Sequence, residues 1–448
     1  MTLSIVPLLG GPLAILLSFL PQALVALAAA VAAWWARRRF GMRRFLKWAF
    51  VLLVVAAVGT GAWVLVPRAP AGSPPIPVDA DWPMFRGGAD RLGVRGEGAF
   101  RGGIRHAWSF REPIRRGVFA SSPAVVGERV FAGAENGRLY CFDAATGNVV
   151  WAFPTLYGIF SSPAVAGGRV YVGEGLHVDT GCSLHCIDVS TGRLLWKFET
   201  KGHVESSPAV LPDRIVFGAG PDGVYAVDLA GKEIWHLEGS HCDGAPLHAN
   251  GLLFLESGYE DPALYVVDPA DGRVVRKHPV PASAWGPPAL AGEDVLFGVG
   301  HRQFGADQPP SPGKVVCLSA RSGALLWEKD LPDVVMSTFA VRDGRACFGC
   351  ADGTVRMIDA GDGRQVWSTA LGKAVLASPA WGADAIVAAT CSGAIVGLDP
   401  EDGRVLWREE TEGLLAAGTG ILGSPALVGN RLYVGGPAFD FLCFEGHR

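Results

Sequence analysis

The stretch SSPAVVGERVFAGAENGRLYCFDAATGNVVWAF, residues 121–153, decides the fold of this chain of 448 residues. Its apolar runs are separated by turns that contain glycine, a pattern typical of four short β-strands. Similar stretches follow one another to the C-terminus, and in each of them one residue ends the third strand: Asp143, Asp188, Asp228, Asp268, Ser319, Asp359, Asp399 and Glu445. Self-similarity with a period of about 40 residues predicts a repeat architecture.

A turn glycine and, four residues later, a tryptophan follow most of these positions, as in Gly147 and Trp151. Glycine adopts the positive φ that a short hairpin turn needs. Tryptophan offers a large apolar surface to the neighbouring repeat. One repeat has Arg276 where the others have tryptophan. Because the aspartate and the tryptophan recur along the chain, we interpret them as structural rather than catalytic.

The ends of the repeat array predict how it closes. A four-stranded unit of this size cannot bury both of its faces alone, so the units are expected to pack radially into a propeller. The last unit stops after its third strand, near Glu445–Arg448, and a separate strand with Trp108 in the matching position, Ile104–Phe110, precedes the first unit. We expect this strand to complete the last blade. The prediction is an all-β, eight-bladed propeller over residues 81–448.

The first 66 residues predict a membrane anchor. Two apolar runs, Leu13–Trp35 and Trp48–Val66, are each long enough to cross a bilayer as a helix. The short loop between them holds six basic residues and no acidic one. Basic loops stay in the cytoplasm, so the propeller is expected on the periplasmic or outer side of the cytoplasmic membrane of a bacterium. A cleaved signal peptide is the alternative, since Ala69-Pro70-Ala71 resembles a cleavage site.

Residues 67–80 contain five prolines and are predicted to form a stiff linker. Residues 67–448 together hold 33 basic and 43 acidic residues, without a basic stripe. This balance argues against nucleic acid as a partner. Four of the nine cysteines occupy one repeat position, which indicates small buried residues rather than disulfides: Cys141, Cys186, Cys317 and Cys443.

Two repeats depart from the pattern in the segments that we predict as their first strands. Aligned on the proline of the Ser-Pro-Ala motif, the third repeat carries His203 and Glu205, and the fourth carries His241 and Asp243, where the other repeats are mostly apolar. Residues two apart in a strand share a face, and first strands line the channel of a propeller. The four side chains are therefore expected to converge near the channel mouth, where they would suit Zn²⁺ or another first-row divalent ion. The alternative is an ordinary polar rim.

The segments FDAATGNVVW, IDVSTGRLLW and LDPEDGRVLW resemble the tryptophan-docking motif A-x-D-x-x-T-G-x-x-x-W of pyrroloquinoline quinone (PQQ)-type propellers. The lead-in DWPMFRGGADRLGV, residues 81–94, resembles the segment that precedes such propellers. The resemblance covers residues 82–446 and implies the propeller fold. The family includes quinoprotein dehydrogenases, the propeller lipoprotein of the outer-membrane β-barrel assembly machinery and many other envelope proteins, so the resemblance alone does not assign a function.

The function expected from the sequence is binding rather than catalysis. Quinoprotein dehydrogenases typically carry an adjacent cysteine pair and a calcium site, and this chain has no two adjacent cysteines. No nucleophile–base pair or phosphate-binding loop is visible in the sequence. We therefore expect a non-catalytic, membrane-anchored scaffold without a cofactor, nearer to the envelope propellers, that binds an envelope protein or a glycan. The alternative is a dehydrogenase that uses PQQ with calcium, or a divalent metal.

Overall fold

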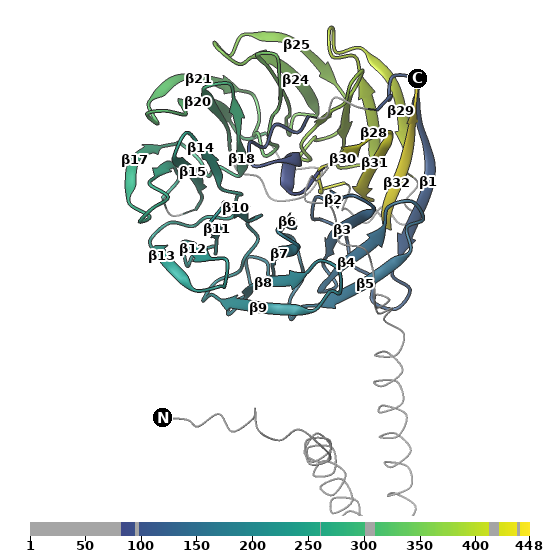
Figure 1. Ribbon diagram of the computed structural model, residues 1–448. Helices are drawn as coiled ribbons and strands as arrows, with labels where there is room; N and C mark the ends of the chain where they lie inside the picture. Colours follow the sequence, from purple (N-terminus) through teal and green to yellow (C-terminus); the bar gives the residue numbers. More distant parts are fainter. Residues whose placement is uncertain (1–81, 95–97, 260, 301–309, 412–420, 437–439) are drawn as a thin grey trace, which may run out of the picture. The chain divides into compact units, whose positions relative to one another are not determined.

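The computed structural model describes residues 82–94, 98–259, 261–300, 310–411, 421–436 and 440–448. The predicted anchor and linker lie outside these residues, and within them no helix combines the length and the apolarity needed to cross a membrane. The described chain forms eight four-stranded antiparallel sheets, the blades, around a central axis (Figure 1). The predicted eight-bladed propeller is therefore confirmed.

In blades 1 to 7 the strands pair in chain order from the axis outward, and in blade 8 the outer strand comes from the N-terminal side of the propeller. Blade 1 contains β2 (Ala124–Val126), β3 (Arg129–Ala134), β4 (Arg138–Asp143) and β5 (Val149–Pro154). Blade 2 contains β6 (Ala164–Ala166), β7 (Arg169–Gly173), β8 (Ser183–Asp188) and β9 (Leu194–Glu199). Blade 3 contains β10 (Ala209–Val210), β11 (Arg214–Gly218), β12 (Val224–Asp228) and β13 (Glu233–Leu237). Blade 4 contains β14 (Leu247–Ala249), β15 (Leu252–Ser257), β16 (Ala263–Val267) and β17 (Val274–Pro279).

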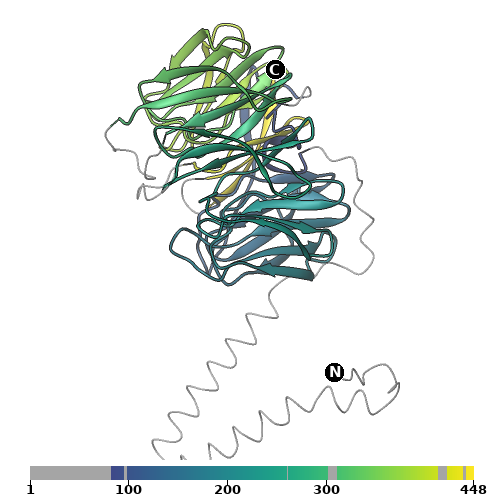
Figure 2. The same cartoon turned by 90° about the vertical axis from the view of Figure 1, so that its left-hand side faces the viewer.

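The later blades lie opposite blades 1 and 2 in the side view (Figure 2). Blade 5 contains β18 (Gly286–Ala291), β19 (Asp294–Val299), β20 (Gly313–Ser319) and β21 (Leu325–Leu331). Blade 6 contains β22 (Ala340–Arg342), β23 (Arg345–Gly349), β24 (Thr354–Asp359) and β25 (Gln365–Ala370). Blade 7 contains β26 (Ala380–Trp381), β27 (Ile386–Ala389), β28 (Ala394–Leu398) and β29 (Val405–Glu410). Blade 8 contains β30 (Ala426–Val428), β31 (Arg431–Gly435), β32 (Asp440–His447) and, as its outer strand, β1 (Gly103–Arg111).

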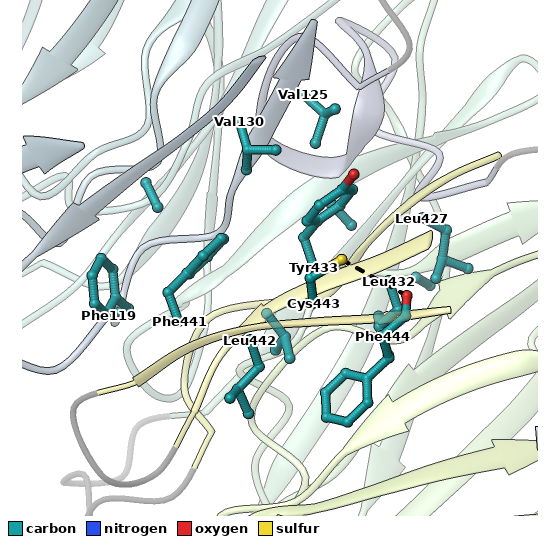
Figure 3. Close-up of a cluster of buried hydrophobic side chains, with 14 of the residues drawn as sticks. Phe119, Val125, Val130, Leu427, Leu432, Tyr433, Phe441, Leu442, Cys443 and Phe444 are labelled. Atoms are coloured by element: carbon teal, nitrogen blue, oxygen red, sulfur yellow. Dashed lines mark hydrogen bonds between the residues drawn. The ribbon is translucent and has the colours of Figure 1, made fainter. Parts of the chain in front are cut away.

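The pairing of β1 with β32 closes the ring. Gly103 lies opposite His447 and Arg111 opposite Asp440, although more than 300 residues separate each pair along the chain. This confirms the predicted donated strand. Closure covers an edge of blade 8 that would otherwise present unpaired backbone groups. Apolar side chains fill the seam between blades 8 and 1 (Figure 3), where the rings of Phe142 and Phe441 stack with their centroids 5.2 Å apart.

The recurring tryptophan and glycine join each blade to the next. Trp151 Nε1 donates a hydrogen bond to the Val189 carbonyl of blade 2 at 3.1 Å. Its ring packs on Gly192, whose φ is 69° and where an added Cβ would lie 2.6 Å from the ring. The same contact recurs in Trp108 with Gly147, Trp196 with Gly231, Trp235 with Gly272 and Trp367 with Gly403. Where Arg276 replaces the tryptophan, its guanidinium donates to the Ser322 carbonyl at 2.8 Å. The recurring tryptophans and glycines thus have a structural role between blades.

Residues 82–94, which include the short 3₁₀ helix η1 (Phe85–Gly87), close one end of the channel. Carbonyls of this plug segment accept hydrogen bonds from inner-strand amides of five blades, namely Val125, Val165, Leu290, Val341 and Trp381. Two buried arginines add contacts: Arg86 donates to the Ser378 carbonyl at 3.3 Å and Arg91 to the Pro246 carbonyl at 3.0 Å. Burial lowers the pKa of Arg86 to about 9 and that of Arg91 to about 10, so both remain charged at neutral pH.

The antiparallel meander gives the propeller two different faces. The connections from the fourth strand of a blade to the next blade, and from its second to its third strand, emerge on one face, which we call the histidine face. The other connections emerge on the opposite face, the plug face, because the plug segment pairs near the ends of the inner strands. A ligand of the channel can therefore be bound on the side that the plug leaves free.

Candidate metal centre

The four residues singled out in the sequence lie in the loops that enter blades 3 and 4. His203 and Glu205 precede β10, and His241 and Asp243 precede β14. The expectation that they belong to the first strands themselves is wrong, because these inner strands are only two and three residues long. The loops nevertheless carry the side chains to the channel mouth on the histidine face.

The two histidines and the aspartate of this set converge. His203 Nε2 lies 2.9 Å from Asp243 Oδ1, and His241 Nε2 lies 3.0 Å from Asp243 Oδ2. The side chains of His203 and Asp243 are only 1% and 10% exposed. The carboxylate of Asp243 therefore lies between imidazoles that reach it from two blades.

A fourth member of the cluster, His177, was not anticipated from the sequence. Its Nε2 lies 3.4 Å from Asp243 Oδ2, and one donor atom from each of His177, His203, His241 and Asp243 lies within 4.8 Å of the others. His177 belongs to the connection between β7 and β8, residues 174–182, which is much longer than the matching connection 135–137 of blade 1. The enlarged loop, visible as an insertion in the repeat, was the signal that could have identified it.

Glu205 does not join the group of four but holds His177. Its Oε1 lies 2.6 Å from His177 Nδ1. Since a carboxylate oxygen accepts the hydrogen bond, Nδ1 carries the proton, and in a neutral imidazole Nε2 then presents a lone pair. This lone pair faces Asp243. Carboxylates commonly orient metal-binding histidines in this way.

The charges of the cluster shift the pKa values of its members. Burial by itself would raise the pKa of Asp243, but the adjacent imidazoles of His203 and His241 outweigh burial and hold the pKa well below its usual range. Burial would lower the pKa of His177, but Glu205 and Asp243 outweigh it and raise the pKa. Asp243 is therefore an anion near neutral pH, as a metal ligand must be.

The loop of His177 is anchored at its base by Glu174, which is buried. One carboxylate oxygen of Glu174 accepts hydrogen bonds from the amides of Leu156 at 2.7 Å and Tyr157 at 3.1 Å. The other oxygen lies 3.2 Å from His185 Nε2. The carbonyl of Glu174 accepts a hydrogen bond from Val204, the neighbour of His203. Glu174 thus fixes two of the three converging segments relative to each other.

Apolar and aromatic side chains surround the cluster. The ring of Tyr259 lies 4.6 Å from that of His241, and the ring of Trp285 lies 5.1 Å from that of His177, measured between centroids. Trp285 also packs against an apolar cluster that fills the other half of the channel mouth: Val334, Met336, Ala351, Ala374 and Leu376. Burial, together with the negative charges of Asp243 and Glu205, raises the pKa of Tyr259 to about 12, so the phenol stays neutral.

A buried acid, Glu256, extends the polar half into the channel. It occupies a position of the second strand where six other blades have glycine: Gly133, Gly173, Gly218, Gly298, Gly349 and Gly435. In blade 1 the partner of this glycine is Ser121, whose Oγ accepts from the Gly133 amide at 2.7 Å. Blade 4 exchanges the pair: Gly244 takes the serine position, and its missing side chain leaves room for Glu256. Neither oxygen of Glu256 has a hydrogen-bond partner among the described residues.

The arrangement can hold a cation, and its donor atoms indicate which kind. Three imidazole nitrogens and one carboxylate suit a borderline transition-metal ion such as Zn²⁺. Calcium takes six to eight oxygen ligands, so these residues do not fit the calcium that accompanies PQQ in the resembled dehydrogenases. The nine cysteines, all within the described residues, form no disulfide, and eight of them are buried.

A family of known proteins matches most of the chain. The profile of the PQQ_2 family, described as outer membrane protein assembly factor BamB, matches residues 102–178, 173–284 and 260–446. No curated protein matches the chain.

Several solved structures share the fold. BamB from Moraxella catarrhalis matches with a TM-score of 0.61 and 14% identity, over 76% of this chain and 99% of that one. Quinohemoprotein alcohol dehydrogenase from Comamonas testosteroni matches with a TM-score of 0.67 and 13% identity, over 83% of this chain and 82% of that one. The computationally designed protein Ika8 matches with a TM-score of 0.62 and 16% identity, over 76% and 99% of the two chains. At these identities the likeness establishes the fold alone.

Proposed function

Because this chain belongs to the family described as outer membrane protein assembly factor BamB, we propose that it is a non-catalytic scaffold of the bacterial cell envelope. In this proposal two N-terminal helices anchor it in the cytoplasmic membrane, and the propeller binds an envelope protein or a glycan outside the cytoplasm. The observation that carries the proposal is the contrast between the two ends of the channel. The plug segment fills one end, and the histidine face presents exposed apolar loops.

Exposed apolar side chains on the histidine face support a binding role. Leu156 and Val178 are 78% and 86% exposed, and Ile114 is similarly exposed. Leu156 and Ile114 lie in connections between blades, and Val178 lies in the enlarged loop of blade 2, so all three emerge on the same face. Contiguous apolar surface marks docking sites, and these three exposed side chains on one face are the support for such a site here.

Site-specific photo-crosslinking in cells tests this role. A photoreactive amino acid at Leu156 or Val178 is expected to crosslink to a discrete envelope component. The matched control places it at Arg193, an exposed residue of the β8–β9 turn on the plug face. Crosslinks of equal yield from Arg193, or none from the histidine face, would contradict the proposal.

The anchor and the location have their own test. A reporter that fluoresces only in the cytoplasm, fused to the C-terminus, is expected to stay dark, because the basic loop Arg37–Lys47 is expected in the cytoplasm and the propeller outside. Bright cells would contradict the location while leaving the scaffold role to the crosslinking experiment.

A dehydrogenase would share this fold, and reconstitution with its cofactor distinguishes it from a scaffold. The full chain, purified in detergent, is incubated with PQQ and calcium, and oxidation of primary alcohols is followed with an artificial electron-accepting dye. We expect no dye reduction above that of the chain without PQQ. Reduction that depends on both PQQ and substrate would replace the scaffold proposal with an oxidoreductase.

A further inference from the structure

We propose that His177, His203, His241 and Asp243 form a zinc site that ties blades 2, 3 and 4 together at the histidine face. This inference goes beyond the scaffold role and does not depend on it. The ion would be held by one residue of the enlarged loop of blade 2, one from the entry to blade 3 and two from the entry to blade 4.

The first observation is a set of buried polar atoms that point at one another without satisfying one another. His177 Nε2, His241 Nε2 and Asp243 Oδ2 are buried, and none of the three has a hydrogen bond of acceptable geometry within the described residues. Yet both nitrogens lie within 3.4 Å of that same oxygen. Leaving such groups unpaired in the interior destabilises the fold. A bound cation would satisfy all three at once.

The spacing of the donor atoms fits a four-coordinate ion. With bonds of about 2.0–2.1 Å, neighbouring ligand atoms of a tetrahedral zinc site lie about 3.3 Å apart. Asp243 meets the three imidazoles at 2.9, 3.0 and 3.4 Å, counting its nearer oxygen in each case. The widest separation in the group, 4.8 Å, exceeds this tetrahedral spacing by about 1.5 Å, so side-chain rotations would bring the most distant donors closer when the ion binds.

A second layer of contacts holds the ligands in place. Glu205 fixes the tautomer of His177 through Nδ1 at 2.6 Å, so that Nε2 is free to bind. Glu174 joins the base of the His177 loop to the segment of His203. In metal sites, such outer contacts orient the ligands and are part of the affinity. An ordinary polar rim has no need of a partly buried carboxylate that orients an imidazole toward another carboxylate.

The surroundings strengthen the interaction of the ligands with a cation. Trp285 separates the cluster from the apolar half of the channel mouth and contacts both. Charges interact more strongly where apolar walls exclude water. The ion would also fix the loop that carries Val178, so zinc would shape the exposed apolar surface beside it.

Zinc binding by the full chain in detergent tests the proposal. After treatment with a chelator and its removal, the wild-type chain is expected to bind one equivalent of Zn²⁺ and to unfold at a higher temperature with Zn²⁺ than without it. Calcium or magnesium at millimolar concentration should not compete. Co²⁺ in place of Zn²⁺ should give the visible absorption of a four-coordinate site, which loose binding at surface histidines does not give.

Single substitutions locate the site. Asp243→Asn and His241→Gln should each weaken Zn²⁺ binding by more than about 100-fold, while a strand-rich circular dichroism spectrum shows that the blades persist. The matched control is His278→Gln, because His278 lies in blade 4 and its Nε2 bonds the Gly323 carbonyl, away from the cluster. It should bind zinc as the wild type does. Stoichiometric binding that survives both cluster substitutions, or no stoichiometric binding by the wild type, would overturn the proposal.

Discussion

The two halves of the channel mouth use the same positions of the repeat for opposite chemistry. The positions compared lie five and three residues before the proline of the Ser-Pro-Ala motif, which is replaced by phenylalanine in blade 6. In blades 6 and 7 these positions carry Val334 and Met336, and Ala374 and Leu376, which pack together. In blades 3 and 4 the same positions carry His203 and Glu205, and His241 and Asp243. The inner strands and their entry loops thus support either a dry apolar contact or a charged cluster.

The two halves differ in what their side chains require from the surrounding residues. The apolar half needs only close packing, since its side chains make no directional contacts. The polar half needs an added loop and a glutamate that orients His177. In blade 4 it also needs Gly244 in place of the usual serine and Glu256 in place of the usual glycine. Polar groups in an interior must be paired, so a charged half requires more changes in the surrounding residues than an apolar one.

The largest expected effect comes from placing a charge in the apolar half. Met336→Asp copies Asp243 at the equivalent position of blade 6, but there it faces the apolar side chains of the cluster instead of imidazoles. A buried carboxylate without a partner is expected to reduce the free energy of unfolding by about 3–5 kcal/mol. Urea denaturation measures the change. Met336→Leu, which keeps the volume, should cost less than about 1.5 kcal/mol. An equal cost for both variants would mean that the halves do not differ in polarity as described.

The next effect concerns pH. Burial, with a smaller contribution from the charge of Asp243, raises the pKa of Glu256 from its ordinary value of 4.5 to about 8, despite the opposing charge of Arg91. Between these two values the folded chain keeps a proton that the unfolded chain releases, so stability falls as pH rises through this window, by up to about 1.4 kcal/mol per pH unit. Glu256→Gln should remove this part of the pH dependence. Its free energy of unfolding, compared with that of the wild type at the same pH, should therefore be more favourable at pH 8 than at pH 5. Urea denaturation at both pH values measures it, and parallel profiles for the two proteins would refute the burial of an ionisable group here.

A smaller effect is expected from the residue that orients His177. Glu205→Gln keeps the size of the side chain but weakens its hydrogen bond to Nδ1 and leaves the tautomer of His177 less defined. Zinc affinity should fall by about 10–100-fold, with little change in the stability of the zinc-free chain. Titration with a competing chelator measures the affinity. Glu199→Gln is the control, because Glu199 pairs with Lys197 on the exposed surface of β9. A loss as large as that of Asp243→Asn would make Glu205 a ligand in its own right.

The smallest effect is expected at the boundary of the two halves. Trp285→Phe keeps an aromatic ring against His177 and the apolar cluster, so it should cost less than about 1.5 kcal/mol of stability. Zinc affinity should stay within about threefold of the wild type, a difference under 1 kcal/mol. Urea denaturation and the same chelator titration measure the two quantities. A tenfold loss of affinity would show that the indole does more than separate the halves.

Much of the fold could be predicted because each repeat has the same residues at the same short spacings. A tight turn needs glycine at a fixed place, and the next blade needs the tryptophan four residues later, so each repeat carries its own signature. The ring closure by residues 104–110 followed from counting strands at the two ends. His203, His241 and Asp243 were visible for a related reason: they break the pattern at positions that the repeat itself defines.

What the sequence determined by itself is therefore the propeller, its number of blades and the sector of the channel that is polar. Only the tertiary structure decided the membership of the cluster. His177 comes from an insertion, which has no counterpart in the repeat and no period that predicts its conformation. Three features depend on distances between blades. They are the approach of His177 to Asp243, the contact of Glu205 with His177, and the hydrogen bonds of the plug segment to five inner strands. Such distances are set when the ring closes and three different blades are brought to one axis, and no spacing along the chain encodes them.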